Sequence, residues 1–284
     1  MIQGIDCSHH NRRFNWDKAK AEGVRFAFIR AMFGYTRDTE FDRNWSEAKR
    51  VGIARGAYGW ALHNMNQKTL AKLFVNRWIN DPGELPPVVD YENTKWHGKA
   101  TFEELRLFMD EVYRLSGLHP IIYTSKGAWN SVPKHSEQLW ALNHHLWVAN
   151  YTLSSQPSMP SVWKTSGTPW TFWQYTSHGD GYKYGSGGKN LDLNWFNGSE
   201  EEFADYVKGD IQPAPLPEQV IVICNKLSFR SRPEIYSGDR PYIPKGTVCK
   251  VLEKVTTDID WYNVELSGGD KGFISAGFNY VRAL

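Results

Sequence analysis

The stretch Leu85-Pro86-Pro87-Val88-Val89-Asp90-Tyr91-Glu92 is a short apolar run that ends in two carboxylates. The run is β-branched and contains two prolines at its start, so it predicts a short buried strand. Residues i and i+2 of a strand point to the same side, so Asp90 and Glu92 should project together from the strand end. Two like charges held close together cannot both ionise at low cost, which raises at least one pKa. A protonated carboxylic acid beside an ionised carboxylate is what cleavage of a glycosidic bond requires.

Strand and helix signals alternate on both sides of this stretch. The expected strands are Ile2–Ile5, Phe26–Arg30, Ala54–Trp60, Pro87–Tyr91, Ile121–Tyr123, Leu146–Ala149, Thr171–Tyr175 and Leu191–Leu193. The clearest helix begins at Thr101, which forms a capping-box pair with Glu104, and it ends at Gly117. Repeated β-α units favour a parallel sheet, and about eight strands in about 200 residues favour closure. The sequence therefore predicts an α/β fold, an irregular TIM-like β/α barrel with about five β/α units followed by three strands.

Four carboxylates mark strand ends of this predicted barrel. Asp6 follows the first strand, Asp90 and Glu92 end the fourth, and Asp192 lies in the last. A single aspartate at a strand end is often only a helix cap or a turn former. Chemistry in a β/α barrel gathers at the C-terminal ends of the strands, so four carboxylates at one rim predict an active site.

Aromatic residues stand at the same strand ends. They are Tyr58, Trp60, Tyr123, Trp147, Tyr151, Trp173 and Tyr175. A cleft edged by aromatic side chains with carboxylates at its floor suits a polysaccharide. The alternative is packing between the barrel and its helices, which we expect for Trp45, Trp78 and Trp140.

Composition excludes several classes of protein. The net charge is +2 with 23% charged residues, so nothing indicates nucleic-acid binding. No apolar run is long enough to enter a membrane as a spanning helix. Cys224 and Cys249 could pair, but the wide spacing of the three cysteines favours reduced, buried thiols. His9-His10 and His144-His145 lack the spacing of metal motifs, so we expect no metal and no cofactor. The absence of a coiled-coil seam predicts a monomer.

A proline-rich segment divides the chain. The predicted organisation is a catalytic barrel at 1–207, a linker at 208–218, and a small all-β module at 219–284. The module has strand signals at Val220–Cys224, Thr247–Lys254, Trp261–Val264 and Gly272–Ile274. It contains no catalytic constellation.

Short motifs in the barrel resemble those of glycoside hydrolase family 25 lysozymes. The motifs are Gly4-Ile5-Asp6-Cys7-Ser8, Gly56-Ala57-Tyr58-Gly59-Trp60, Asp90-Tyr91-Glu92, Trp147-Val148-Ala149-Asn150-Tyr151, Trp173-Gln174-Tyr175-Thr176 and Leu191-Asp192-Leu193-Asn194. They occur in the family's order and cover roughly residues 1–200. The resemblance implies a β/α barrel with irregular late strands. It also implies an N-acetylmuramidase that hydrolyses the β-1,4 bond between N-acetylmuramic acid and N-acetylglucosamine in bacterial peptidoglycan.

The resemblance also implies roles for individual residues. Glu92 is the expected general acid, and Asp6, Asp90 and Asp192 are the expected supporting carboxylates. Asp90 either orients the substrate's own acetamido group or attacks the anomeric carbon directly. The expected sugar contacts are Tyr58, Trp60, Tyr123, Trp147, Tyr151 and Gln174. The chain departs from the family pattern at Phe33, which replaces a polar position, and at Gly59, which replaces a histidine.

The C-terminal module resembles bacterial SH3-like wall-binding domains. The motifs that carry this resemblance are Leu227-Ser228-Phe229-Arg230-Ser231-Arg232-Pro233, Pro244-Lys245-Gly246-Thr247, Trp261-Tyr262-Asn263-Val264 and Gly272-Phe273-Ile274. The resemblance implies binding to the peptide or cross-bridge parts of peptidoglycan.

The N-terminal sequence has neither the basic nor the apolar region of a secretory signal. We therefore expect a phage or prophage endolysin that is made in the cytoplasm and reaches the wall after release. The alternatives are a secreted bacterial autolysin or toxin of the same activity, a non-catalytic peptidoglycan-binding protein, and a chitinase-like hydrolase. The last is disfavoured because Val88 stands where chitinases carry a further acidic residue.

Overall fold

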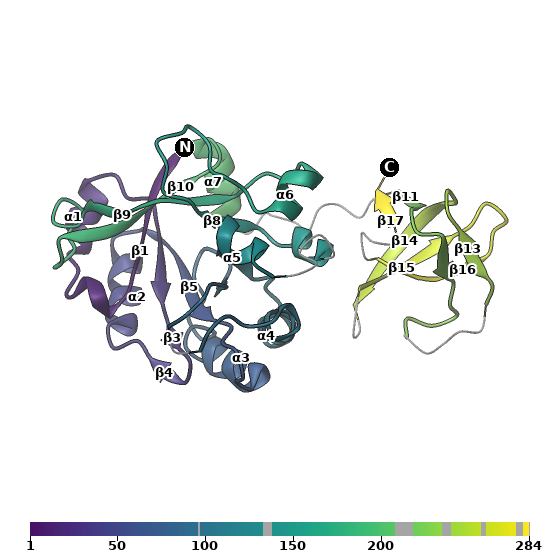
Figure 1. Cartoon of the computed structure of the whole chain (residues 1–284), viewed down its shortest axis with the longest axis horizontal. Helices are drawn as coiled ribbons and strands as arrows, with labels where there is room; N and C mark the ends of the chain where they lie inside the picture. The colour runs from purple at the N-terminus through teal and green to yellow at the C-terminus, as the bar shows by residue number, and fades with distance from the viewer. Residues whose placement is uncertain are drawn as a thin grey trace. The chain divides into compact units, whose positions relative to one another are not determined.

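The computed structural model describes residues 1–95, 97–132, 138–207, 218–234, 240–256, 260–276 and 281–283. The chain forms two compact units, Met1–Asp210 and Ile211–Leu284 (Figure 1). Most of the predicted linker, residues 208–217, lies outside the described residues.

The first unit is built on a closed eight-stranded barrel in the order β1-β10-β9-β8-β7-β6-β5-β2. Its strands are β1 (Ile2–Cys7), β2 (Phe26–Arg30), β5 (Ala54–Trp60), β6 (Val88–Asp90), β7 (Ile121–Ser125), β8 (Leu146–Ala149), β9 (Phe172–Asp180) and β10 (Asn190–Phe196). The predicted α/β barrel is therefore confirmed. A two-stranded hairpin of β3 (Met32–Phe33) and β4 (Thr36–Arg37) follows β2 and was not predicted.

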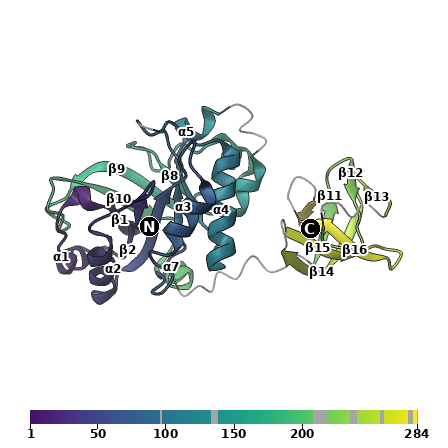
Figure 2. The same ribbon diagram turned by 90° about the horizontal axis from the view of Figure 1, so that it is seen from below.

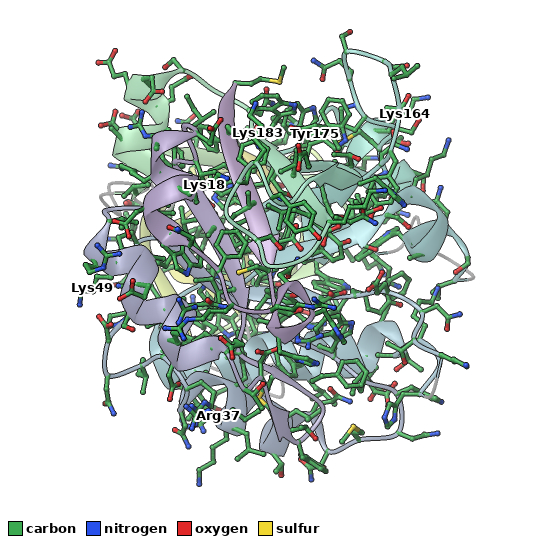
Figure 3. All side chains as sticks on the ribbon, turned by 90° about the vertical axis from the view of Figure 1, so that its left-hand side faces the viewer. Lys18, Arg37, Lys49, Lys164, Tyr175 and Lys183 are labelled. Atoms are coloured by element: carbon green, nitrogen blue, oxygen red, sulfur yellow. The ribbon has the colours of Figure 1, made fainter. Side chains whose placement is uncertain are left out.

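Helices surround the barrel (Figures 1 and 2). They are the short η1 (His9–Asn11), α1 (Trp16–Ala21), α2 (Phe41–Arg50), α3 (Gln67–Val75), α4 (Phe102–Ser116), α5 (Lys126–Asn130), η3 (Leu139–Asn143), α6 (Ser161–Ser166) and α7 (Glu200–Val207). The outer faces of these helices are polar: Lys18 of α1 and Lys49 of α2 are exposed, as Figure 3 shows. The opposite faces bury apolar side chains against the barrel.

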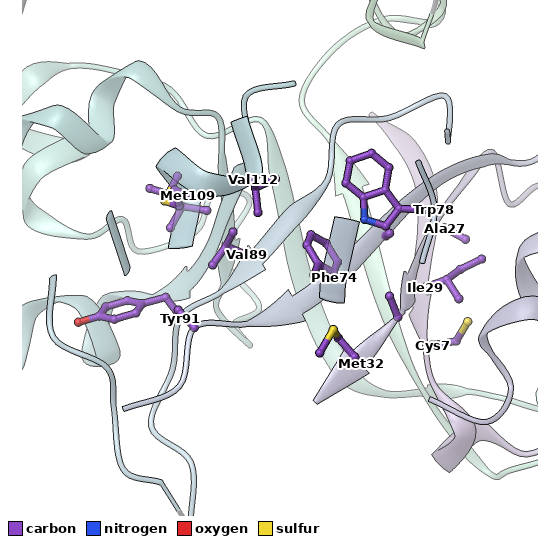
Figure 4. Close-up of a cluster of buried hydrophobic side chains, with 14 of the residues drawn as sticks. Cys7, Ala27, Ile29, Met32, Phe74, Trp78, Val89, Tyr91, Met109 and Val112 are labelled. Atoms are coloured by element: carbon purple, nitrogen blue, oxygen red, sulfur yellow. The ribbon is translucent and has the colours of Figure 1, made fainter. Parts of the chain in front are cut away.

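The helix α4 follows its predicted signals from end to end. Thr101 caps the N-terminus and exchanges hydrogen bonds with Glu104, which confirms the capping box. Gly117 ends the helix with a φ of 72°, a left-handed conformation that glycine adopts without strain. Met109 and Val112 face Val89 of β6 in the buried cluster of Figure 4. This packing holds the helix-facing side of β6, the strand that carries Asp90.

Two features of the late barrel differ from the predicted pattern. Among the described residues, each of the first six barrel strands is followed by a helix before the next barrel strand, although α5 and α6 have only five and six residues. We had expected about five β/α units. The last strand, β10, runs antiparallel to both β9 and β1, so the sheet is not wholly parallel.

Aromatic side chains fill the interior of the barrel. Phe26, Phe28 and Phe172 are fully buried and their rings lie 5.0–5.7 Å apart. Trp147 packs on Phe28 with a centroid distance of 4.3 Å. The barrel is therefore a packed core rather than a pore, and polar chemistry is confined to its mouth.

The second unit is all-β in its described residues, as predicted. A five-stranded sheet has the order β16-β15-β14-β11-β17, and a two-stranded sheet pairs β12 with β13. The bounds are β11 (Gln219–Val222), β12 (Lys226–Ser228), β13 (Tyr242–Pro244), β14 (Val248–Thr256), β15 (Asp260–Glu265), β16 (Lys271–Ser275) and β17 (Val281–Ala283).

The three cysteines are free thiols. Cys7 and Cys249 are buried and Cys224 is half-buried. None of the helices within the described ranges combines the length and apolar character needed to cross a membrane.

Candidate active site

The carboxylates predicted from the sequence meet at one rim of the barrel. Asp6 of β1 lies directly opposite Asp192 of β10 in the strand register. Asp90 of β6 lies between Trp60 of β5 and Tyr123 of β7. Glu92 follows the end of β6, so the four acids belong to the mouth of the barrel.

The position of Asp192 corrects the reason for which it was chosen. We had counted it as a residue at the end of a parallel strand. It lies instead near the beginning of β10, and β10 runs antiparallel to its neighbours. The two differences cancel, because the start of an antiparallel strand lies at the same rim as the ends of the parallel ones.

A network of hydrogen bonds holds Asp6 in place. Its Oδ2 accepts hydrogen bonds from Gln174 Nε2 and Asn194 Nδ2, both at 2.8 Å. The oxygen Oε1 of Gln174 in turn accepts from the hydroxyls of Tyr123 at 2.9 Å and Tyr151 at 2.8 Å. All these groups except Tyr151 are buried, so the network fixes the floor of the mouth before any substrate binds.

Asn194 is a part of this network that we did not single out. Its Oδ1 accepts a hydrogen bond of 2.8 Å from Trp147 Nε1, while its amide nitrogen donates to Asp6. The signal was present in the sequence, because Asn194 stands two residues after Asp192 on the same strand and so shares its face.

Burial raises the pKa of each of the four acids, and repulsion from neighbouring carboxylates adds to the effect for Asp90, Glu92 and Asp192. Burial raises the pKa of Asp6 to about 6, against the two hydrogen bonds that favour its ionised form. Burial, with the charges of Asp6 and Glu92, raises the pKa of Asp192 to about 8. Burial also raises the pKa of Glu92, with Asp6 adding to the effect. For Asp90 the causes are burial and then the charges of Glu92 and Asp6, and its pKa is well above the ordinary range. The site therefore binds protons near neutral pH.

Arg30 is a second residue that the sequence analysis did not place in the site. It ends β2, its side chain is nearly buried, and its Nε donates to Asp38 Oδ2 at 2.7 Å. Its guanidinium carbon lies 5.8 Å from the centre of the Trp60 ring. The positive charge lowers the pKa of Asp90 against the larger effect of burial. No clear sequence signal pairs Arg30 with Asp38, because the β3–β4 hairpin brings them together.

The six expected sugar contacts divide into two groups. Tyr58, Tyr123 and Trp147 are 7%, 8% and 2% exposed, and Gln174 is 3% exposed. These four form the floor of the mouth and support it from beneath. Trp60 is half-buried and Tyr151 is 56% exposed, so these two present ring surface at the mouth. Trp45, Trp78 and Trp140 pack against the core, as expected.

A metal centre is not formed by the residues that the structure describes. Within them, no group of three or more His, Cys, Asp or Glu side chains is arranged to hold an ion. His9, which we had considered, bonds to the carboxylate of Asp38 through Nδ1 at 2.9 Å.

Comparison with known proteins gives the family. The model of the glycosyl hydrolases family 25 matches residues 5–182, which include Asp6, Asp90 and Glu92. The chain belongs to this family. It is therefore a glycoside hydrolase, and the resemblance noted in its sequence motifs is confirmed for the barrel.

Relatives of the family 25 chain include named lysozymes and muramidases. This chain is 32% identical over 211 residues to lysozyme M1 of Streptomyces globisporus, and the match covers 70% of this chain and 68% of that one. The crystal structure of a lysozyme from Streptomyces coelicolor matches with a TM-score of 0.62 and 28% identity over 73% of this chain and 97% of that one. A muramidase from Acremonium alcalophilum matches with a TM-score of 0.61 and 26% identity, over 74% of this chain and all of the other.

The crowding of acids in this family 25 site should reduce the stability of the fold above neutral pH. The pKa of Asp192 is raised from 3.8 to about 8, so its contribution to stability is fully present below pH 4 and is lost as the pH rises to 8. Asp192→Asn cannot ionise and should be more stable than wild type at pH 8, by about 1–2 kcal/mol because water still reaches the half-buried carboxylate. At pH 4 the two proteins should be equal. Urea unfolding at both values measures this, and an equal difference at both would contradict it.

Proposed function

We propose that the protein is a peptidoglycan muramidase that cleaves the β-1,4 bond between N-acetylmuramic acid and N-acetylglucosamine. The observation that carries the proposal is the cluster of Asp6, Asp90, Glu92 and Asp192 at the mouth of a family 25 barrel, each with a raised pKa. The lysozyme and muramidase relatives support the same bond.

Glu92 is the proposed proton donor. It is half-buried at the end of β6, whereas Asp90 is only 4% exposed and lies deeper. The raised pKa of Glu92 keeps its carboxyl protonated at higher pH, so that it can protonate the glycosidic oxygen. After the leaving sugar departs, the carboxylate of Glu92 takes a proton from the attacking water.

Asp90 acts on the other side of the reaction. Its Oδ1 is buried and has no hydrogen-bond partner among the described residues, so its capacity to accept a hydrogen bond is not used within the protein. The oxygen either accepts a hydrogen bond from the acetamido group, which then attacks the anomeric carbon, or makes that attack itself. In both cases the ionised form is the active one, and the charge of Arg30 favours it.

Analysis of the products tests the bond that is cut. Digestion of purified walls, reduction with borohydride and mass spectrometry should show reduced muramic acid at the new chain ends. Reduced glucosamine at those ends would show a glucosaminidase and overturn the proposal. Binding of walls without any new reducing end would support the rival interpretation, a non-catalytic peptidoglycan-binding protein.

The second unit is the proposed wall-binding module, of bacterial SH3-like type. What supports this is its small all-β architecture and the exposed ring of Tyr242, which has the ammonium of Lys226 5.9 Å from its centre. The module would raise the local concentration of the enzyme on an insoluble wall. Residues 1–210 alone should then pellet with walls less completely than the whole chain.

We also propose that the protein acts as a monomeric endolysin that reaches the wall through a membrane lesion. The modular organisation, a catalytic barrel and a separate β unit, supports this. Bacteria that produce the protein in the cytoplasm should lyse only after their membrane is permeabilised. Lysis without permeabilisation would favour a secreted autolysin, and a dimer in light scattering would contradict the monomer.

A further inference from the structure

A cation points into the mouth of the barrel beside the carboxylates. Phe28 and Val88 belong to the cluster inside the barrel, and Arg30 and Asp90 stand two residues further along the same strands. Since residues i and i+2 of a strand share a face, the side chains of Arg30 and Asp90 point inward as well. The strand β5 lies between β2 and β6, and its Trp60 pairs with Asp90 and has its ring centre 5.8 Å from the guanidinium carbon of Arg30.

Arg30 nevertheless forms its ion pair away from Asp90. Its Nε donates to Asp38 Oδ2 at 2.7 Å, and its Nη2 lies 2.5 Å from His9 Nδ1. The side chain of Asp38 is wholly buried, so this pair is shielded from water. The Oδ1 of Asp90, in contrast, has no hydrogen-bond partner in the described parts of the chain. The cation is thus close enough to act on Asp90 through its charge but is bound to another carboxylate.

Backbone donors hold Asp38 in place. The amide of His9 donates to both carboxylate oxygens at 3.1 Å, and the amide of Glu40 donates to Oδ1 at 3.0 Å. The amide of Asp38 itself donates to Ala31 O at 3.0 Å. Burial opposes ionisation of Asp38, but the hydrogen bonds from His9 and Arg30 outweigh it and hold its pKa below the ordinary value. Asp38 is therefore a fixed, ionised partner for the guanidinium.

The charge of Arg30 acts on several groups around it. Besides its two partners, the titratable side chains that it affects are Cys7 of β1, His10 of η1, Tyr58 of β5 and Asp90 of β6. Burial is the larger influence on each, because it lowers the pKa of His10 and raises the pKa of the other three. Arg30 lowers all four pKa values. Among these groups, Asp90 is the one whose charge the proposed reaction uses.

A guanidinium in this position needs a partner of its own. Arginine carries five N–H donors in a planar fork that fits a carboxylate, so an unpaired Arg30 would bind an acid of the mouth. Of the four acids, Asp90 is the one whose pKa the charge of Arg30 lowers. A direct pair between them would occupy the carboxylate oxygens of Asp90.

We propose that Asp38 is a positioning residue that holds Arg30 out of contact with Asp90. From this position the cation favours the ionised form of Asp90 and leaves its Oδ1 unpaired within the described residues. The inference rests on the role proposed for Asp90 and adds the residue that keeps its carboxylate unoccupied.

Kinetics of Asp38→Asn across pH, on soluble glycan strands, test the proposal. The released Arg30 should pair with Asp90, so kcat per folded molecule should fall about 10- to 100-fold, because a charge-assisted hydrogen bond must break before Asp90 can act. The acid limb of the pH profile should move to lower pH, since a closer cation lowers the pKa of Asp90 further. Adding Arg30→Gln to Asp38→Asn should then restore kcat to the value of Arg30→Gln alone. A purely structural role of Asp38 would leave the acid limb in place.

A matched control and a second variant complete the experiment. Asp42→Asn is the control, because Asp42 is an exposed aspartate at the start of α2 that pairs with Arg77 at 2.9 Å, and it should behave as wild type. Asp38→Glu keeps the charge but displaces the carboxylate by one methylene group, and it serves if Asp38→Asn does not fold; its smaller loss should also be relieved by Arg30→Gln. Wild-type kinetics of the folded variants, or a loss that persists after Arg30→Gln, would overturn the inference. Full activity of Asp90→Asn would instead overturn the role proposed for Asp90.

Discussion

Replacing Glu92 with Gln should lower kcat on purified cell walls by about 10³-fold. The amide has the shape of the carboxylic acid but cannot release a proton to the glycosidic oxygen, and general acid catalysis contributes about 10²–10⁴-fold. The fold should not suffer, because the variant removes one of four crowded acids and relieves Asp90 and Asp192 of its charge. Loss of wall turbidity and the release of reducing ends are the measurements.

The pH profile gives this prediction a second readout. Activity of the wild type should fall as the pH rises through the pKa of Glu92, which burial moves upward from the value of a free glutamate. The residual activity of Glu92→Gln should lack this limb. Glu103→Gln is the control, because Glu103 is exposed in the first turn of α4 and should clear walls as wild type does. Wild-type clearing by Glu92→Gln would remove Glu92 from its assigned role.

Much of the barrel could be predicted because its strands are separate apolar runs. The strands β2, β5 and β8 begin and end at the expected residues. The direction of β10 could not be predicted, since the alternation of side chains along a strand is the same in either direction. Asp192 lies at the same rim as the other acids only because its position near the start of the strand compensates for the reversed direction.

The sequence indicates the carboxylates of the site, but it does not show which other side chains surround and position them. Asp90 and Glu92 are two residues apart, so local geometry alone placed them together. Arg30 and Asp38 meet through a hairpin of two-residue strands that propensity does not show. Trp147 and Tyr151 stand in one motif, yet the first is buried in the barrel and the second is exposed. That difference follows from closure of the barrel, which depends on all eight strands at once.

Replacing Asp90 with Asn should lower kcat by about 10²–10³-fold while the protein still binds walls. Asp90 has no hydrogen-bond partner at Oδ1 within the described residues, so the change breaks no internal bond there and the effect falls on the substrate. The variant should also be at least as stable as wild type near neutral pH. The raised pKa of Asp90 means that ionisation of this group costs stability, which an amide avoids.

A thiazoline analogue of N-acetylmuramic acid separates the two roles proposed for Asp90. This compound resembles the bicyclic intermediate that forms when the acetamido group attacks the anomeric carbon. If Asp90 orients that group, the analogue should inhibit wild type strongly, and Asp90→Asn should bind it at least tenfold more weakly. If Asp90 is the nucleophile, the analogue should inhibit poorly, and azide should restore cleavage by Asp90→Gly through a glycosyl azide. In either case, the charge of Arg30 lowers the pKa of Asp90, so Arg30→Gln should move the acid limb of the pH profile to higher pH and leave the alkaline limb, which reports Glu92, in place.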